Sequence, residues 1–145
     1  MKKLRVLFLC VHNSARSQIA EGLMRALASE RVQAFSAGSE PAFVHPLARR
    51  VLEERGIDAS HQRSKSVNEF ANERFDYVIT LCAEEVCPIF LGATHKLHWA
   101  LPDPAATPGS EAEKLDAFRR TADEVERRLR HFLAERDLDA HSSHQ

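Results

Sequence analysis

Residues 4–17, LRVLFLCVHNSARS, decide the fold of this chain. The apolar run over residues 4–9 predicts a strand that is buried on both faces. From Ser17 onward the pattern changes, and Ile19, Leu23 and Leu27 recur every four residues on one face of a predicted helix. Residues 10–17 therefore form a short loop that joins a buried strand directly to the N-terminus of a helix.

The rest of the chain continues this alternation of strand and helix. Strands are predicted over residues 32–37, 76–82 and 96–100, and helices over residues 46–55, 66–73 and 115–132. Alternating strands and helices predict an α/β fold with three layers (αβα), in which a four-stranded parallel sheet has the order 2-1-3-4. Such sheets bind ligands at the carboxyl ends of their strands where the strand order reverses, which here is the loop after the first strand.

Length and composition exclude several classes of protein. The 145 residues predict a single domain over residues 1–140 and a short tail at 141–145. A formal net charge of -1 gives the chain no general affinity for nucleic acid or an anionic membrane, and no apolar run is long enough to span a bilayer. Three cysteines are too few for a disulfide-stapled secreted protein, so we expect a cytoplasmic protein with reduced thiols.

Residues 10–17 carry the chemistry expected of an oxyanion site. A loop that curls into a helix N-terminus points several backbone N–H groups at one spot, and the positive end of the helix adds to the attraction for an anion. Arg16 can add a planar two-pronged donor, and the same positive field favours the thiolate form of Cys10, to which Ser17 can donate its hydroxyl. Asn13 tolerates the left-handed backbone angles that a tight loop requires. The sequence therefore predicts a nucleophilic thiol that faces a bound oxyanion. The residues expected to bind the oxyanion are Val11, His12, Asn13, Ser14, Ala15, Arg16 and Ser17.

Several motifs resemble those of a known family. The spacing Cys-x5-Arg-Ser after the first strand resembles the low-molecular-weight protein tyrosine phosphatase fold, and CVHNSARSQIAEG over residues 10–22 resembles the thioredoxin-coupled arsenate reductases. The resemblance extends from residue 3 to residue 133. It includes Ser36-Ala37-Gly38, Thr80-Leu81-Cys82, Cys87-Pro88, and Trp99 followed by Asp103-Pro104.

The resemblance implies that the three cysteines form a relay that reduces arsenate to arsenite in arsenic detoxification. In this mechanism Cys10 attacks arsenate, Cys82 attacks Cys10 to release arsenite, and Cys87 moves the resulting disulfide to Cys82–Cys87. Thioredoxin is then the implied electron donor, and no tightly bound cofactor is implied. Arsenate is the implied substrate, with phosphate as a weaker analogue.

The positions of the cysteines are consistent with part of this relay. Cys82 ends a predicted strand beside the one that leads to Cys10, and adjacent strands lie about 4.8 Å apart, so both thiols are expected at one edge of the sheet. A helical 82–87 segment would separate its end Cα atoms by about 7.5 Å, too far for a disulfide. We therefore hypothesise that residues 82–90 are mobile and differ between the reduced and oxidised forms. The alternative interpretation of Cys82 and Cys87 is two ordinary buried cysteines.

Asp103 is the candidate general acid, because in the related phosphatases an Asp-Pro loop protonates the leaving group. A common Asp-Pro turn is the structural alternative. The phosphatase pattern has aromatic residues after this Asp-Pro, whereas this chain has Ala105 and Ala106, which favours a small inorganic oxyanion over a phosphoprotein. A phosphatase that uses Cys10, Arg16 and Asp103 to hydrolyse phosphate monoesters remains the alternative function.

The resemblance also concerns a cation site. Some family members bind potassium near the loop, and this chain matches at Asn13, Glu21 and Ser36 but has Lys65 where an acid is expected. Our hypothesis is that Lys65 replaces the bound cation and pairs with Glu21 or a neighbour; the alternative is a solvated surface lysine. The 8 histidines show no zinc-motif spacing, so no metal site is expected.

Overall fold

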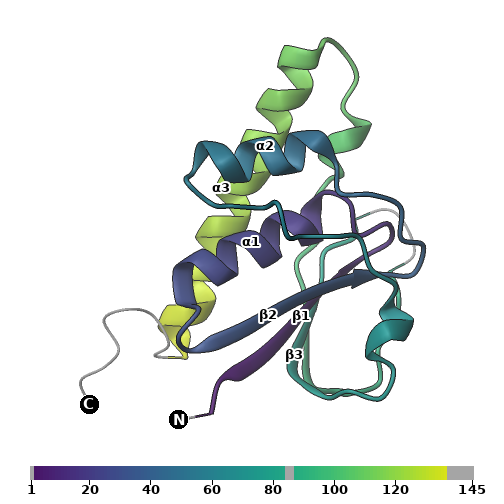
Figure 1. Cartoon of the computed structure of the whole chain (residues 1–145), viewed down its shortest axis with the longest axis vertical. Helices are drawn as coiled ribbons and strands as arrows, with labels where there is room; N and C mark the ends of the chain where they lie inside the picture. The colour runs from purple at the N-terminus through teal and green to yellow at the C-terminus, as the bar shows by residue number, and fades with distance from the viewer. Residues whose placement is uncertain (1, 84–86, 137–145) are drawn as a thin grey trace.

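A four-stranded parallel sheet in the order β2-β1-β3-β4 forms the centre of the molecule (Figure 1). The structure is a computed structural model, and it describes residues 2–83 and 87–136. Along the chain the elements are β1 (Leu4–Cys10), α1 (Arg16–Ala28), β2 (Val32–Gly38), α2 (Pro46–Glu54), the 3-10 helix η1 (Val67–Phe70), β3 (Phe75–Thr80), β4 (Ala93–His98), the 3-10 helix η2 (Pro104–Ala106) and α3 (Glu111–Glu135). The α/β class and the strand order predicted from the sequence are both confirmed.

The two faces of the sheet are covered unequally. Figure 1 shows α1, α2 and α3 together on one side of the sheet, with η1 away from them. Successive residues of β1 point to opposite faces, so Val6 and Phe8 join the large core beneath the α-helices, whereas Leu7 and Leu9 join a smaller cluster. That smaller cluster contains Phe70 of η1, together with Phe75 and Phe90. Helical structure thus flanks the sheet on both faces, as expected for three layers.

The strand predicted over residues 76–82 is β3, which ends at Thr80, so Cys82 follows the strand instead of ending it. Two other predicted elements differ more from the observed ones. The helix predicted over residues 66–73 is only the four-residue η1, which begins where the Ser66 side chain accepts a hydrogen bond from the Asn68 N–H and buries the single side chain of Phe70. The strand predicted over residues 96–100 is β4, which begins earlier, at Ala93, and ends at His98. β4 is an edge strand with mostly exposed residues, so it lacks the apolar run that marks a buried strand.

α3 is the longest helix and confirms the apolar pattern of the C-terminal sequence. It begins with a capping box, in which the Ser110 hydroxyl accepts from the Glu113 N–H and the Glu113 carboxylate accepts from the Ser110 N–H. Its buried side chains are Leu115, Ala117, Phe118, Ala122, Val125, Leu129, Phe132 and Leu133. The tail predicted at 141–145 and the domain boundary at residue 140 lie outside the described residues. Among the residues described, no helix has the length and apolar character required to cross a membrane.

Candidate active site

The loop between β1 and α1 is fixed by the side chain of Asn13. Asn13 has a φ of 49°, in the left-handed region that its sequence position suggested. Its buried Oδ1 accepts from the backbone N–H of Lys65 at 2.8 Å and from Gln18 Nε2 at 2.9 Å, and its Nδ2 donates to Ser17 Oγ at 2.8 Å. One side chain thus ties the loop to the start of α1 and to the segment that precedes η1.

Backbone N–H groups of the segment that follows β2 donate hydrogen bonds to the carbonyl groups of this loop. The backbone N–H of Glu40 donates to the Val11 carbonyl at 2.8 Å, and the backbone N–H of His45 donates to the Ser14 carbonyl at 3.0 Å. The His12 carbonyl accepts from the Ala42 N–H at 3.3 Å. In a trans peptide the N–H points away from the preceding C=O, so the N–H groups of residues 12, 13 and 15 turn toward the inside of the loop. This arrangement of amides has the geometry of an anion-binding nest, which is what the sequence predicts for the loop.

Gly38 packs directly against the back of the loop. A Cβ atom at this position would lie 2.8 Å from the carbonyl oxygen of Cys10 and 2.9 Å from the backbone nitrogen of Asn13, and it would also clash with the carbonyl oxygen of Val11. Only glycine fits without displacing this backbone. This contact explains the Ser36-Ala37-Gly38 motif at the end of β2.

A pocket of about 260 Å³ opens in front of the loop. Its lining comes from three separate segments, namely the loop itself, residues 42–45 after β2, and the start of η2. The lining residues are Cys10, His12, Ser14, Ala15, Arg16, Ala42, Phe43, His45, Asp103 and Ala105. The structure thus brings the predicted nucleophile, the predicted arginine and the predicted general acid to one pocket.

Cys10 lies at the end of β1, and its side chain is buried. Its Sγ is 2.8 Å from Ser17 Oγ. Because Ser17 Oγ already accepts a hydrogen from Asn13 Nδ2, its own hydroxyl hydrogen is available for the sulfur. Ser17 can therefore donate its hydroxyl hydrogen to Cys10 Sγ, and Cys10 lines the pocket.

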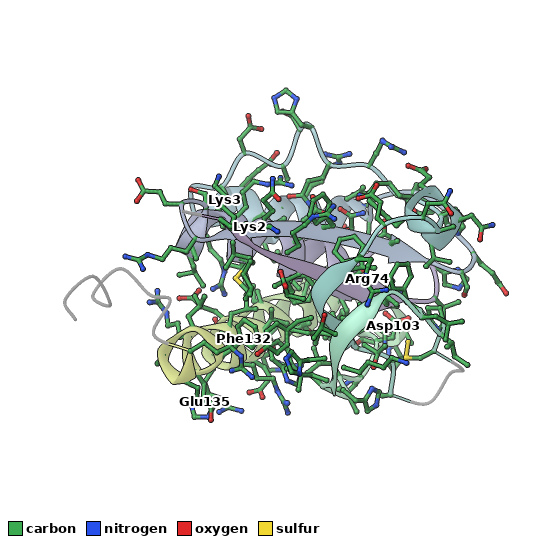
Figure 2. The ribbon with its side chains drawn as sticks, turned by 90° about the horizontal axis from the view of Figure 1, so that it is seen from below. Lys2, Lys3, Arg74, Asp103, Phe132 and Glu135 are labelled. Carbon is green, nitrogen blue, oxygen red and sulfur yellow. A yellow bond between two sulfur atoms is a disulfide. The ribbon has the colours of Figure 1, made fainter. Side chains whose placement is uncertain are left out.

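Arg16 and Asp103 line the same pocket as Cys10. The buried Arg16 side chain donates from Nη1 to the Leu101 carbonyl at 3.0 Å, and its Nη2 lies 4.0 Å from Asp103 Oδ2. Asp103 also caps η2, since its Oδ1 accepts from the Ala105 N–H at 3.0 Å. Figure 2 places Asp103 on the other side of the view from Phe132 and Glu135, which belong to the last part of α3. Both the turn interpretation and the active-site interpretation of Asp103 thus have a structural basis.

Cys82 and Cys87 are joined by a disulfide, with their Cα atoms 5.6 Å apart. The backbone beyond β3 continues beside β1, because the Leu81 N–H donates to the Leu9 carbonyl at 2.9 Å. Cys82 is buried, whereas Cys87 is half-buried. Cys10 is a free thiol. Residues 84–86 lie outside the described part of the chain, so the predicted mobility of residues 82–90 stays a prediction.

The four residues of the possible cation site lie together. The carboxylate of Glu21 is buried, accepts from the Ser36 hydroxyl, and lies 3.5 Å from Lys65 Nζ. Arg25 Nη2 donates to its other oxygen at 2.5 Å. Burial lowers the pKa of Lys65, and the neighbouring Glu21 carboxylate opposes that shift. Lys65 is therefore not the solvated surface lysine of the alternative interpretation.

Three residues of the pocket were not identified from the sequence: Ala42, Phe43 and His45. Phe43 is 60% exposed and its ring stacks on that of His45, with centroids 6.2 Å apart. In the sequence, an aromatic residue shortly after the motif of residues 36–38 was the signal that could have identified Phe43. The position of His45 directly before Pro46 was a signal for a helix cap but not for a pocket residue. Ala105 and Ala106 follow Asp103-Pro104 where the phosphatase pattern has aromatic residues, and the aromatic side chain of this pocket, Phe43, comes from a different segment.

Comparison with known proteins agrees with this site. The family model for low molecular weight phosphotyrosine protein phosphatase matches residues 5–143. The chain belongs to this family.

Within that family the chain belongs to the arsenate reductases. It is 38% identical to an arsenate reductase of Halalkalibacterium halodurans, over 91% of this chain and 96% of the relative. A solved structure described as an arsenate reductase in the phosphate binding state has a TM-score of 0.76 and 33% identity, over 91% of this chain and 98% of that one. A thioredoxin-dependent arsenate reductase of Corynebacterium glutamicum has a TM-score of 0.71 and 34% identity, over 92% of this chain and 61% of that one.

Proposed function

We propose that this protein reduces arsenate to arsenite through a relay of Cys10, Cys82 and Cys87, and that thioredoxin regenerates it. The observation that carries the proposal is the bonded pair Cys82–Cys87, which follows the strand next to the oxyanion loop and its free thiol. Hydrolysis of a phosphate ester requires one thiol and water, and it does not require two further thiols. Arsenate reductases that match the chain over nine-tenths of its length add support.

The first step forms a covalent arsenic adduct. The Cys10 thiolate attacks arsenate, an S–As bond forms, and one arsenate oxygen leaves as water after it receives a proton. The N–H groups of the loop and the guanidinium of Arg16 hold the remaining oxygens. Asp103, which lies 4.0 Å from Arg16, is the proposed donor of the proton to the leaving oxygen.

The next two steps supply the electrons. The Cys82 thiolate attacks Cys10 Sγ, the S–As bond breaks with its electron pair left on arsenic, and arsenite departs from a Cys10–Cys82 disulfide. The Cys87 thiolate then attacks Cys82 Sγ, which releases Cys10 as a thiolate. The Cys82–Cys87 disulfide of the structure corresponds to the product of this last internal step.

Thioredoxin is the proposed partner that restores the two thiols, in the cytoplasm, where it keeps thiols reduced. Its thiolate would attack Cys87 rather than Cys82, because Cys87 is half-buried and Cys82 is buried. Ile89 and Leu91 are 79% and 83% exposed and follow Cys87 closely in the sequence. These two side chains, which we call the 89/91 patch, give the partner an apolar contact beside the disulfide. The thioredoxin dependence of the Corynebacterium glutamicum relative supports the same choice.

The test is arsenate-dependent consumption of NADPH in the presence of thioredoxin and thioredoxin reductase. The wild type is expected to be active, and Cys10→Ser, Cys82→Ser and Cys87→Ser are each expected to lose turnover. Activity that survives in all three variants would end this proposal.

Hydrolysis of aryl phosphate esters is a second candidate function, favoured by the exposed ring of Phe43 in the wall of the pocket. Cys82→Ser should abolish arsenate turnover and spare hydrolysis of p-nitrophenyl phosphate, because hydrolysis does not use Cys82. Phe43→Ala should raise the KM for this aryl ester and leave the KM for arsenate unchanged. An unchanged KM for the ester would remove the argument from Phe43.

A further inference from the structure

His45 lies where three parts of the site meet. Its backbone N–H donates to the Ser14 carbonyl of the oxyanion loop, and its ring lines the pocket with Cys10 and Asp103. On the other side the ring packs on Phe118 of α3, with centroids 4.7 Å apart. Its place is thus set by the main chain on one side and by the core on the other.

The tautomer of His45 follows from its role as the N-cap of α2. Its Nδ1 accepts a hydrogen bond from the backbone N–H of Leu47 at 3.1 Å. In the neutral ring the hydrogen is therefore on Nε2. A second proton has to bind Nδ1, which removes this cap and places a positive charge at the positive end of a helix.

The charges around His45 oppose one another. Burial lowers the pKa of His45, whereas Asp103 on the η2 side and Glu111 of α3 raise it, and Lys114 of α3 lowers it. Within the pocket it shares the lining with Cys10, His12 and Arg16. Because burial lowers the pKa of His45, its ring is neutral around neutral pH, and a negative charge added to the pocket would raise that pKa.

We propose that His45 is a specificity-determining residue of the oxyanion pocket, whose ring takes up a proton when a doubly charged oxyanion binds and thereby strengthens that binding. The proposal rests on the proposed function only in that the pocket binds a tetrahedral oxyanion; it does not require the thiol relay. Binding and protonation are linked, so the factor by which protonation tightens the anion equals the factor by which the anion raises the proton affinity of His45.

Sulfate is the probe for the test, because it stays doubly charged throughout the pH range in which histidine titrates. Cys10→Ser is used as the parent protein so that the thiol does not titrate. Its partner is the double variant Cys10→Ser with His45→Asn, since asparagine is a good N-cap but does not titrate. The contributions of His12 and of the other groups in the pocket are common to both proteins and cancel in the comparison.

As the pH falls through the pKa of His45, sulfate affinity is expected to rise more in the parent than in the His45→Asn protein. The ratio of the two rises is expected to be about three- to tenfold. An NMR titration of the His45 ring in the parent should show that saturating sulfate raises its pKa. The size of that rise should equal the logarithm of the same factor. This second measurement needs no substitution at His45, so it holds even where His45→Asn fails to fold.

Equal pH dependence in the two proteins, or a His45 titration that sulfate does not move, would overturn the proposal while leaving the oxyanion site intact. No sulfate binding in either protein at any pH would overturn the oxyanion site and the proposed function with it. Thermal unfolding of His45→Ala and His45→Asn distinguishes the effect of losing the helix cap from the effect of losing the titratable ring. Both variants lose the ring, but only the alanine variant is expected to lose the cap.

Discussion

At the scale of single residues, the site depends on short polar side chains and one glycine. The Asn13 side chain orders the loop, because it accepts hydrogen bonds from Lys65 and Gln18 and donates one to Ser17. The hydroxyl hydrogen of Ser17 is then available to Cys10. None of these contacts requires a large or charged group. Arg16 and the oriented amides place positive charge in the pocket, so the proposed anion binding is compatible with a formal net charge of -1.

Gly38→Ala is expected to weaken the binding of phosphate or sulfate sharply. The new Cβ would press on the backbone of residues 10, 11 and 13, so the loop must shift, at a cost of about 1–3 kcal/mol in stability. Calorimetry of phosphate binding together with urea denaturation measures both effects. Gly56→Ala is the matched control, because Gly56 has a φ of 79° and open space around it. That control should lose stability and keep its phosphate affinity; equal affinity in both variants would contradict the role of Gly38.

Lys65 is expected to make the enzyme indifferent to potassium. Its ammonium group lies 3.5 Å from Glu21, where a cation would otherwise neutralise the carboxylate. Wild-type activity in potassium should therefore equal that in sodium, whereas Lys65→Asp should be activated by potassium and Lys65→Met should not. Arsenate turnover in the two salts at constant ionic strength measures this. Marked potassium activation of the wild type would count against the substitution of the cation by lysine.

At the scale of elements, the site is assembled by segments that lie between the regular elements. The segment after β2 supports the loop through the amides of Glu40, Ala42 and His45, and it ends in the cap of α2. The segment before η1 contributes the Lys65 amide. The start of η2 contributes Asp103. The last residue of β1 and the first residue of α1 supply Cys10 and Arg16, and the connecting segments supply the rest of the pocket.

The 89/91 patch is expected to matter for thioredoxin and not for arsenate. Replacing both Ile89 and Leu91 by serine removes exposed apolar surface beside Cys87, so the KM for thioredoxin should rise severalfold at unchanged KM for arsenate. The coupled NADPH assay at varied thioredoxin concentration measures it. Reduction of the Cys82–Cys87 disulfide by dithiothreitol is the control and should proceed at the wild-type rate. A KM for thioredoxin equal to that of the wild type would exclude the patch as a contact.

At the scale of the whole molecule, one face of the sheet has a large core and the other a small one. The large core joins three α-helices, including Phe118 and Phe132 of α3. The small cluster depends on aromatic packing among Phe35, Phe70 and Phe75. Arg5 packs on this small cluster, and its guanidinium lies 4.6 Å from the centre of the Phe75 ring. Phe90, which follows Cys87 closely in the sequence, is another member of this small cluster.

The oxidised protein is expected to be more stable than the reduced protein by about 2 kcal/mol, because the Cys82–Cys87 bond closes a short loop in the unfolded chain. Urea denaturation with and without a reductant measures the difference. Cys10→Ser should show the same difference, since Cys10 is not part of this bond. A variant in which both Cys82 and Cys87 are serine should show none. Equal stability of the oxidised and reduced wild type would contradict this prediction.

The sequence predicted the parts of the fold that have a strong local pattern. The buried run of β1, the helix that follows it and the three- and four-residue steps of α3 were all recognisable. The helix predicted at η1 was too long. A capping serine marks where a helix begins, but it does not indicate whether four or eight helical residues follow. β4 was misplaced, because an edge strand of mixed polarity lacks the signal of a buried one.

The sequence by itself determined the oxyanion loop, because its strand, its turn residues and its helix N-terminus are contiguous and each acts through local geometry. Only the tertiary structure decided which distant residues complete the pocket. Phe43 and His45 enter it because the backbone of residues 40–45 pairs with the loop, and Lys65 meets Glu21 because the segment before η1 closes over α1. Such contacts depend on packing between segments far apart in the chain, and no local pattern encodes them.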